Sequence, residues 1–194
     1  MKRREFFKAA TALTAGAAAA TALAAPAIAQ GNQTWRMVTT WPPGFAGLGT
    51  GAVRLAERIT QASGGRIDVS VHGGGELVQP FEVFDAVSAG KAELGHSASY
   101  YWKAKSEAAP FFCAVPFGLN ALEMNAWLLH GGGLALWREL YARFDLVPFP
   151  AGNTGTQMAG WSNREITSLA DMKGLRMRIP GIGGEVMGRL GAVP

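Results

Sequence analysis

The sequence predicts an α/β protein with mainly parallel sheets, divided into two lobes. Segments rich in β-branched and aromatic residues alternate with segments whose apolar residues recur at helical spacing. Turns that contain glycine or proline separate these segments. The alternation restarts after about residue 120. Successive β-α-β units favour a parallel sheet flanked by helices, and the restart predicts a second lobe.

Two consecutive β-α-β units are expected in the first lobe. The predicted elements are a strand over 35–40, a helix over 50–62, a strand over 66–72, a helix over 80–89 and a strand over 92–97. Ligands of parallel sheets bind at the carboxyl ends of the strands. We therefore expect a binding site near Trp41, His72 and residues 97–101.

A second series of elements is predicted beyond residue 120. These are helices over 120–130 and 134–143, strands over 146–149, 156–162 and 175–179, and a helix over 183–190. Ser168 and Asp171 fit a capping pattern at a helix start. Residues 191–194 follow the last predicted helix where a strand is expected to begin. We therefore expect residues 30–122 to form the first part of one lobe and residues 123–194 a second lobe that is incomplete at its C-terminal side.

Residues 1–29 have the features of a signal peptide. A charged start precedes an apolar stretch and the small-x-small sequence Ala27-Ile28-Ala29. The apolar stretch is too short to be a transmembrane helix. Arg3 and Arg4, followed by Glu-Phe-Phe-Lys, indicate a twin-arginine-type signal, with an ordinary secretory signal as the alternative. We expect a periplasmic protein that starts at Gln30.

The composition argues against several function classes. Residues 1–29 carry four basic side chains and one acidic side chain, so the formal net charge of +4 falls by three to +1 without them. This charge gives no indication of nucleic-acid binding. Cys113 is the only cysteine and lies among apolar residues, where we expect a buried inert thiol. The three histidines show no zinc-binding spacing. We expect no catalytic cofactor.

One glycine motif supports an alternative function. Gly47, Gly49 and Ala52 match the G-x-G-x-x-A pattern of dinucleotide-binding proteins, between a predicted strand and a predicted helix. An exported dinucleotide-dependent oxidoreductase is therefore the alternative. Against it, residues 41–46 separate the strand from the first glycine, and Asp68 lies near the start of the next strand rather than its end.

Several polar side chains are candidates for ligand contacts. Tyr100 and Tyr101 follow a predicted strand, where their hydroxyl groups suit a ligand oxygen, whereas Trp102 is equally well explained as a core residue. Arg176 and Arg178 point to the same face of a predicted strand. They are either solvated edge charges or include a guanidinium that binds a carboxylate bidentately.

The sequence resembles a known family in two segments. Residues 75–90 carry Gly-Glu-Leu followed by Phe-Glu-Val-Phe-Asp-Ala-Val-Ser-Ala-Gly, a pattern shared widely among binding proteins. Residues 169–180, Leu-Ala-Asp-Met-Lys-Gly-Leu-Arg-Met-Arg-Ile-Pro, are more specific. On these segments, residues 30–194 resemble the DctP-type extracytoplasmic receptors of tripartite ATP-independent periplasmic (TRAP) transporters. The chain is most similar to the branch that binds 2-oxo acids and other small monocarboxylates, on the segments Thr39-Thr40-Trp41-Pro42, Tyr100-Tyr101-Trp102 and residues 151–157.

The resemblance implies a non-enzymatic receptor of the periplasmic-binding-protein class. Its two α/β lobes would close on a small carboxylate, such as pyruvate or lactate, and deliver it to a TRAP membrane permease. Arg178 matches the arginine that binds the ligand carboxylate. Gln157 matches a residue that touches both the ligand and a bound cation, sodium or calcium. One or both of Tyr100 and Tyr101 match tyrosines that contact the ligand.

Overall fold

The computed structural model of the protein describes residues 31–194. The predicted signal peptide, residues 1–29 with its paired arginines, lies outside the described residues. Across the described part of the chain, we find no helix with both the length and the apolar character needed to cross a membrane.

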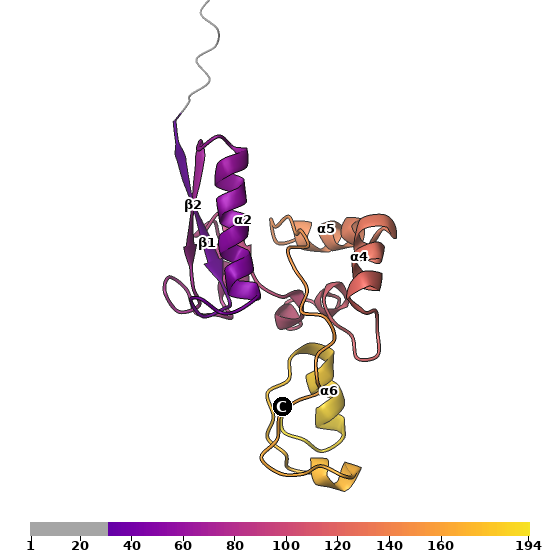
Figure 1. Ribbon diagram of the computed structural model, residues 1–194. Coiled ribbons are helices and arrows are strands. Elements are labelled where there is room, and N and C mark those ends of the chain that lie inside the picture. The colour runs from indigo at the N-terminus through magenta and orange to yellow at the C-terminus, as the bar shows by residue number, and fades with distance from the viewer. Residues whose placement is uncertain (1–30) are drawn as a thin grey trace, which may run out of the picture. The chain divides into compact units, whose positions relative to one another are not determined.

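A parallel sheet of three strands opens the described chain (Figure 1). The strands are β1 (Gln33–Thr39), β2 (Ile67–His72) and β3 (Leu94–His96), in the order β2-β1-β3. Trp35 lies opposite Val69 in the β1–β2 register, and Val38 lies opposite Gly95 in the β1–β3 register. The predicted α/β class with a parallel sheet is therefore confirmed.

Helix α2 (Leu48–Ala62) covers the sheet (Figure 1). Its small residues Ala52 and Ala56 are buried against Met37 of β1. Small side chains on the inward face let the helix approach the strand closely, which removes Met37 almost completely from water. Charged residues on the other face, such as Arg54, are exposed.

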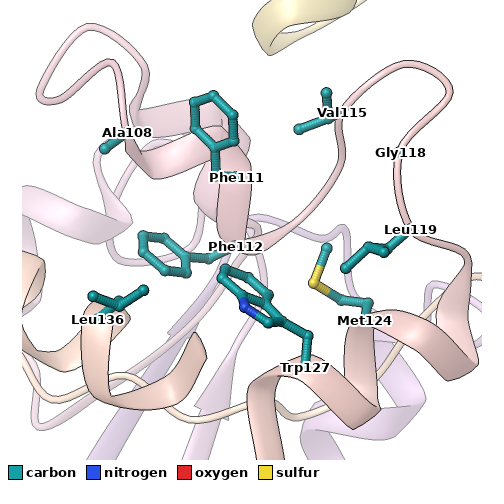
Figure 2. Close-up of a pocket in the computed structure, with 9 residues that line it drawn as sticks. All are labelled: Ala108, Phe111, Phe112, Val115, Gly118, Leu119, Met124, Trp127 and Leu136. Atoms are coloured by element: carbon teal, nitrogen blue, oxygen red, sulfur yellow. The ribbon is translucent and has the colours of Figure 1, made fainter. Parts of the chain in front are cut away.

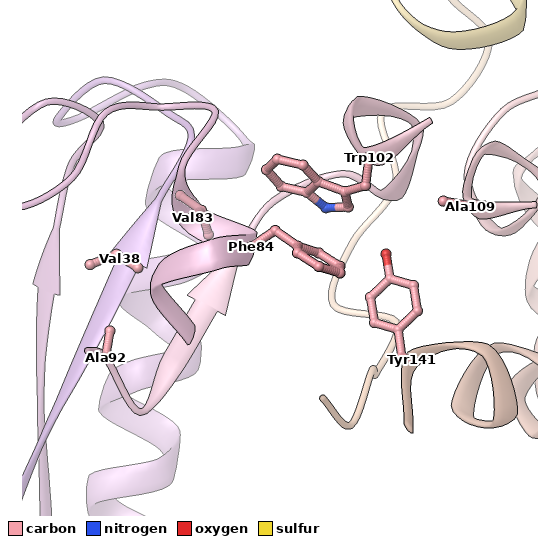
Figure 3. Close-up of a cluster of buried hydrophobic side chains, with 7 residues drawn as sticks. All are labelled: Val38, Val83, Phe84, Ala92, Trp102, Ala109 and Tyr141. Atoms are coloured by element: carbon pink, nitrogen blue, oxygen red, sulfur yellow. The ribbon is translucent and has the colours of Figure 1, made fainter. Parts of the chain in front are cut away.

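A second core joins the sheet to the helices that follow it. Helix α3 (Val83–Ser88) is shorter than the predicted 80–89, and Gly90, whose φ of 68° suits glycine, follows its C-cap residue Ala89. Phe84 of α3 points toward Trp102 and Tyr141 (Figure 3), with ring centroids 5.4 and 5.6 Å away. Trp102 is 5% exposed, so it is a core residue.

Two α-helices and two short 3₁₀ turns follow the sheet. The turns are η1 (Ser99–Trp102) and η2 (Ala109–Phe112), and the helices are α4 (Ala121–His130) and α5 (Gly133–Ala142). Asn120 caps α4 by accepting hydrogen bonds from the N–H groups of Leu122 and Glu123. Phe112 stacks with Trp127 and Trp137 at centroid distances of 5.7 and 5.6 Å. Tyr141 of α5 packs into the core that Phe84 occupies.

The segment over 146–180 differs from the prediction. Residues 146–149 and 156–162 form no strand, and the predicted strand 175–179 is reduced to one parallel bridge between Arg176 and Val193. An extended segment becomes a strand only when a neighbouring backbone satisfies its N–H and C=O groups, and the described residues supply no such neighbour for 146–149 and 156–162.

The helical predictions for the C-terminal part agree with the structure. The 3₁₀ turn η3 (Leu169–Met172) starts with the predicted capping box of Ser168 and Asp171, and helix α6 spans Gly181–Arg189. Capping and helix formation need only local partners. The division into lobes at about residue 122 stays a prediction.

Candidate functional site

The carboxyl ends of β1 and β3 are tied together by hydroxyl groups. The Thr40 backbone N–H donates to the carbonyl of His96 at 3.2 Å. The Thr40 side-chain hydroxyl donates to the carbonyl of Pro80 at 2.9 Å and lies 2.6 Å from the hydroxyl of Ser97. These bonds hold the chain that follows β1 against the chain that follows β3, as expected for the ligand-binding edge of a parallel sheet.

Trp41 and His96 form a buried hydrogen-bonded pair at this edge. The indole N–H of Trp41 donates to Nδ1 of His96 at 2.7 Å, and each residue is only 7% exposed. Burial lowers the pKa of His96, so the imidazole is neutral at pH 7. Since Nδ1 accepts this bond, the imidazole proton resides on Nε2. This pairing was not predicted from the sequence.

Tyr101 lies at the centre of an aromatic cluster. It stands in η1, directly after β3, and its ring centroid is 4.5 Å from that of Tyr100 and 5.1 Å from that of Phe81. Trp41 approaches it at 6.3 Å. The tilted and edge-on ring geometries are those that aromatic side chains prefer. Tyr101 is thereby fixed at the sheet edge while remaining half-buried rather than covered.

The structure brings Arg178 to this cluster from far along the sequence. One Nη2–H of Arg178 donates to the hydroxyl oxygen of Tyr101 at 2.8 Å, and the guanidinium carbon lies 5.5 Å from the ring centroid. A guanidinium has five N–H donors, and Arg178 remains exposed. The arrangement therefore has the donors needed to bind a carboxylate beside the tyrosine hydroxyl.

Burial raises the pKa of two acidic groups near this contact, the Tyr100 phenol and the Cys113 thiol. Burial is the largest influence on Tyr100 and raises its pKa well above the ordinary value, with a further contribution from the hydrogen bond to Tyr101. Burial also raises the pKa of the Cys113 thiol to about 11, although the N–H groups of Tyr100 and Ser99 oppose the shift. A phenol is neutral at pH 7 with its ordinary pKa, and burial raises the pKa of Tyr100 further. The raised pKa of the thiol agrees with the inert cysteine predicted above.

Helix α6 is packed against η1 at a glycine. Gly181 has a φ of 64°, and a Cβ atom placed there would lie 3.1 Å from Cβ of Tyr100. Lys103 and Glu185 form an ion pair at 3.3 Å across the same contact. The close approach that Gly181 permits explains how Arg178, three residues earlier, reaches Tyr101.

Gln157 is not part of this hydrogen-bonded group. It is exposed, and its side-chain N–H donates to the hydroxyl of Thr154 at 2.6 Å. The strand predicted over 156–162, which was expected to carry it, is not formed. Within residues 31–194 no group of three His, Cys, Asp or Glu side chains could hold a metal ion. The cation-binding role of Gln157 therefore remains a prediction.

A cavity elsewhere in the molecule is unsuited to a carboxylate. It measures about 460 Å³ and is lined by apolar and aromatic side chains of η2, α4, α5 and the loop before α4 (Figure 2). Phe111, Trp127 and Leu136 are among them. A carboxylate buried on such a surface would lose its hydration without gaining a hydrogen bond or a charged partner.

The glycine motif at 47–52 opens helix α2. Gly47 precedes the helix with a φ of 78°, a backbone conformation that favours glycine. A Cβ atom on Gly49 would lie 3.1 Å from Cβ of Phe45 and 3.4 Å from the carbonyl oxygen of Pro42. The glycines are thus accounted for by the turn into α2 and by close packing within its own loop.

Comparison with known proteins gives a consistent set of matches. Residues 37–194 match the DctP family, described as bacterial extracellular solute-binding protein, family 7. The chain is 47% identical over 195 residues to a monocarboxylate 2-oxoacid-binding periplasmic protein of Nostoc sp., covering 98% of this chain and 53% of that protein. These matches give the oxidoreductase alternative no support.

Solved structures show the same likeness. A TRAP periplasmic solute-binding protein of Pseudoalteromonas atlantica with bound sodium and pyruvate is 42% identical, with a TM-score of 0.81 over 84% of this chain and 50% of that one. A Colwellia psychrerythraea protein with bound calcium and pyruvate gives the same values. A Bordetella bronchiseptica protein with calcium and picolinate is 43% identical, with a TM-score of 0.82 over 84% of this chain and 49% of that one. The chain spans about half the length of the relatives it matches.

Proposed function

This chain belongs to the DctP family of bacterial extracellular solute-binding proteins, and we propose from this premise that it is a receptor for a small monocarboxylate. The proposed ligand is a 2-oxo acid such as pyruvate, or lactate, bound together with a sodium or calcium ion. The protein would capture the ligand in the periplasm without transforming it and deliver it to the permease subunits of a TRAP transporter. Residues 1–29 would direct its export as a twin-arginine-type signal.

The observation that carries this proposal is the contact between Arg178 and Tyr101. A guanidinium and a phenol hydroxyl 2.8 Å apart form a compact set of donors at the carboxyl edge of the sheet. Arginine can bind both oxygens of a carboxylate at once, which an ammonium group cannot copy. The aromatic rings around Tyr101 leave an apolar surface for the short carbon chain of a monocarboxylate.

The other site residues have supporting roles in the proposal. Tyr100 would donate from its hydroxyl to a ligand oxygen, since a phenol is neutral at pH 7 and burial raises its pKa further. Gln157 would contribute its amide carbonyl to the cation and its N–H to the ligand, since hard cations prefer oxygen ligands. Gln157 lies on an exposed segment, and it would have to approach Arg178 from there.

Calorimetry tests the proposal directly. The purified chain is titrated with pyruvate, lactate and longer 2-oxo acids in sodium, in calcium and with a chelator. We expect saturable binding of at least one acid, and Arg178→Lys should weaken it about tenfold or more. Arg176→Lys is the matched control, because Arg176 is an exposed arginine two residues away. Equal affinities for the two variants would contradict the assignment of Arg178.

A further inference from the structure

We propose that His96 is a positioning residue whose imidazole fixes the orientation of the Trp41 ring, and through that ring the position of Tyr101. The proposal rests on the proposed function only for the effect on ligand binding. The geometric part stands on the contacts among His96, Trp41 and Tyr101 alone.

The hydrogen bond between the two rings has one direction. The indole nitrogen can only donate, so Nδ1 of His96 must be the acceptor over the 2.7 Å that separates them. The ring centroids are 6.2 Å apart with an interplanar angle of 74°, so the edge of the indole faces the imidazole. Rotation of Trp41 about its side-chain bonds would break this hydrogen bond in a buried setting, which is unfavourable.

The other ring nitrogen of His96, Nε2, is buried without a hydrogen-bond partner in the described part of the chain, which destabilises the folded state. Nε2 carries the proton and has no hydrogen-bond partner among residues 31–194. An unpaired buried donor is destabilising, and a phenylalanine of similar shape would avoid that cost. The hydrogen bond that His96 accepts from Trp41 therefore compensates for the cost of burying its unpaired Nε2–H.

Trp41 transmits this orientation to the proposed carboxylate site. Its ring lies 6.3 Å from that of Tyr101 and 6.4 Å from that of Phe45, with the latter stacked. Tyr101 in turn accepts the hydrogen bond from Arg178. A Trp41 ring free to rotate would leave Tyr101 without lateral support, and the phenol oxygen would no longer be held at a fixed distance from the guanidinium.

Two substitutions separate the hydrogen bond from the bulk of the ring. His96→Gln keeps an acceptor for the indole N–H, whereas His96→Phe keeps a ring and has no acceptor. His130→Phe, at the exposed end of α4, is the control for loss of a histidine. The chain is labelled with ¹⁵N-tryptophan, and Trp41→Phe identifies the indole resonance of Trp41 among the six tryptophans.

We expect the chemical shift of the Trp41 indole N–H to indicate a hydrogen bond in the wild type, in His96→Gln and in His130→Phe. In His96→Phe this chemical shift should change, because the acceptor is lost. In titrations with pyruvate and calcium, His96→Phe should bind about three- to tenfold more weakly, while His96→Gln stays within about twofold. If His96→Phe does not fold in thermal unfolding measurements, Trp41→Phe removes the donor instead and should weaken binding to the same extent.

Three results would overturn the proposal. One is an unchanged Trp41 resonance in His96→Phe, another is equal weakening of binding by His96→Gln and His96→Phe, and the third is wild-type affinity in both His96→Phe and Trp41→Phe. If the wild type binds no carboxylate, the proposed function fails. The positioning role is then judged by the Tyr101 ring resonances, which should move in His96→Phe and not in His96→Gln.

Discussion

Two regions of the chain, residues 33–142 and residues 146–180, both contain segments with the apolar pattern of strands. They differ in whether a neighbouring strand pairs with those segments. In the first region, β1 pairs with strands on both sides, and Val38 near its carboxyl end is 1% exposed. In the second, residues 146–149 and 156–162 have strand-like composition but form no strand, and Trp161 is 91% exposed. A β-type pattern therefore specifies which faces are apolar, whereas strand formation depends on a neighbouring backbone.

The candidate site draws on both regions. Tyr101 is held by the aromatic cluster of the first, and Arg178 comes from the second. The contact between them depends on α6, where Gly181 allows a close approach to Tyr100. The first region thus supplies a rigid surface, and the second supplies a charged group brought to it.

The largest difference in stability between the two regions is expected for the substitution of a tryptophan in each. Trp102→Ala should reduce the free energy of unfolding by about 3–5 kcal/mol, because it removes a ring buried against Phe84. Trp161→Ala should change it by less than about 0.5 kcal/mol, because the ring is exposed. Urea unfolding of both variants measures the difference. Similar losses would show that Trp161 is buried in solution.

An intermediate effect is expected for two helix caps. Asn120→Ala should cost about 1 kcal/mol of global stability, since Asn120 caps α4, which packs on the core. Ser168→Ala removes a similar capping box from η3 but should leave the global transition unchanged and speed amide exchange only near residue 171. Thermal unfolding and hydrogen exchange report the two effects. A lower midpoint for Ser168→Ala would show that the second region unfolds together with the first.

The smallest effect concerns the pH dependence of stability. The hydrogen bonds from Arg36 lower the pKa of Glu93 to about 2 from its ordinary 4.5. The folded state therefore gains stability from Glu93 above pH 4.5, and loses it as the pH falls from about 4.5 toward 2. Glu93→Gln should flatten this part of the stability profile slightly, because the pair is exposed.

A matched acidic residue lies in the second region. Hydrogen bonds from Ser168 and Thr167 lower the pKa of Asp171. Asp171→Asn should leave the acid branch of the global stability profile as it is in the wild type, because Met172 is the one buried residue of η3. If Glu93→Gln and Asp171→Asn reduced the pH dependence of global stability equally, the two regions would not differ in their contribution to that stability.

The elements predicted correctly from the sequence are those whose formation depends on neighbouring residues in the chain. The alternation of apolar residues predicted β1, α2 and β2, and the specific segment over 169–180 led to the family that the comparisons confirm. The hydrogen bond between Trp41 and His96 was not predicted, because its partners are 55 residues apart and the segment that contains Trp41 does not indicate His96 as its partner. The strands predicted over 146–162 were wrong because composition does not report the presence of a pairing partner.

If a carboxylate binds as proposed, the contact between Arg178 and Tyr101 affects the entropy of that binding. A free arginine side chain samples many rotamers, and fixing it costs entropy. Its hydrogen bond to a tyrosine already clamped among aromatic rings restricts those rotamers within the folded chain itself. The entropy loss is therefore incurred during folding, which leaves more of the favourable interaction energy to appear as affinity.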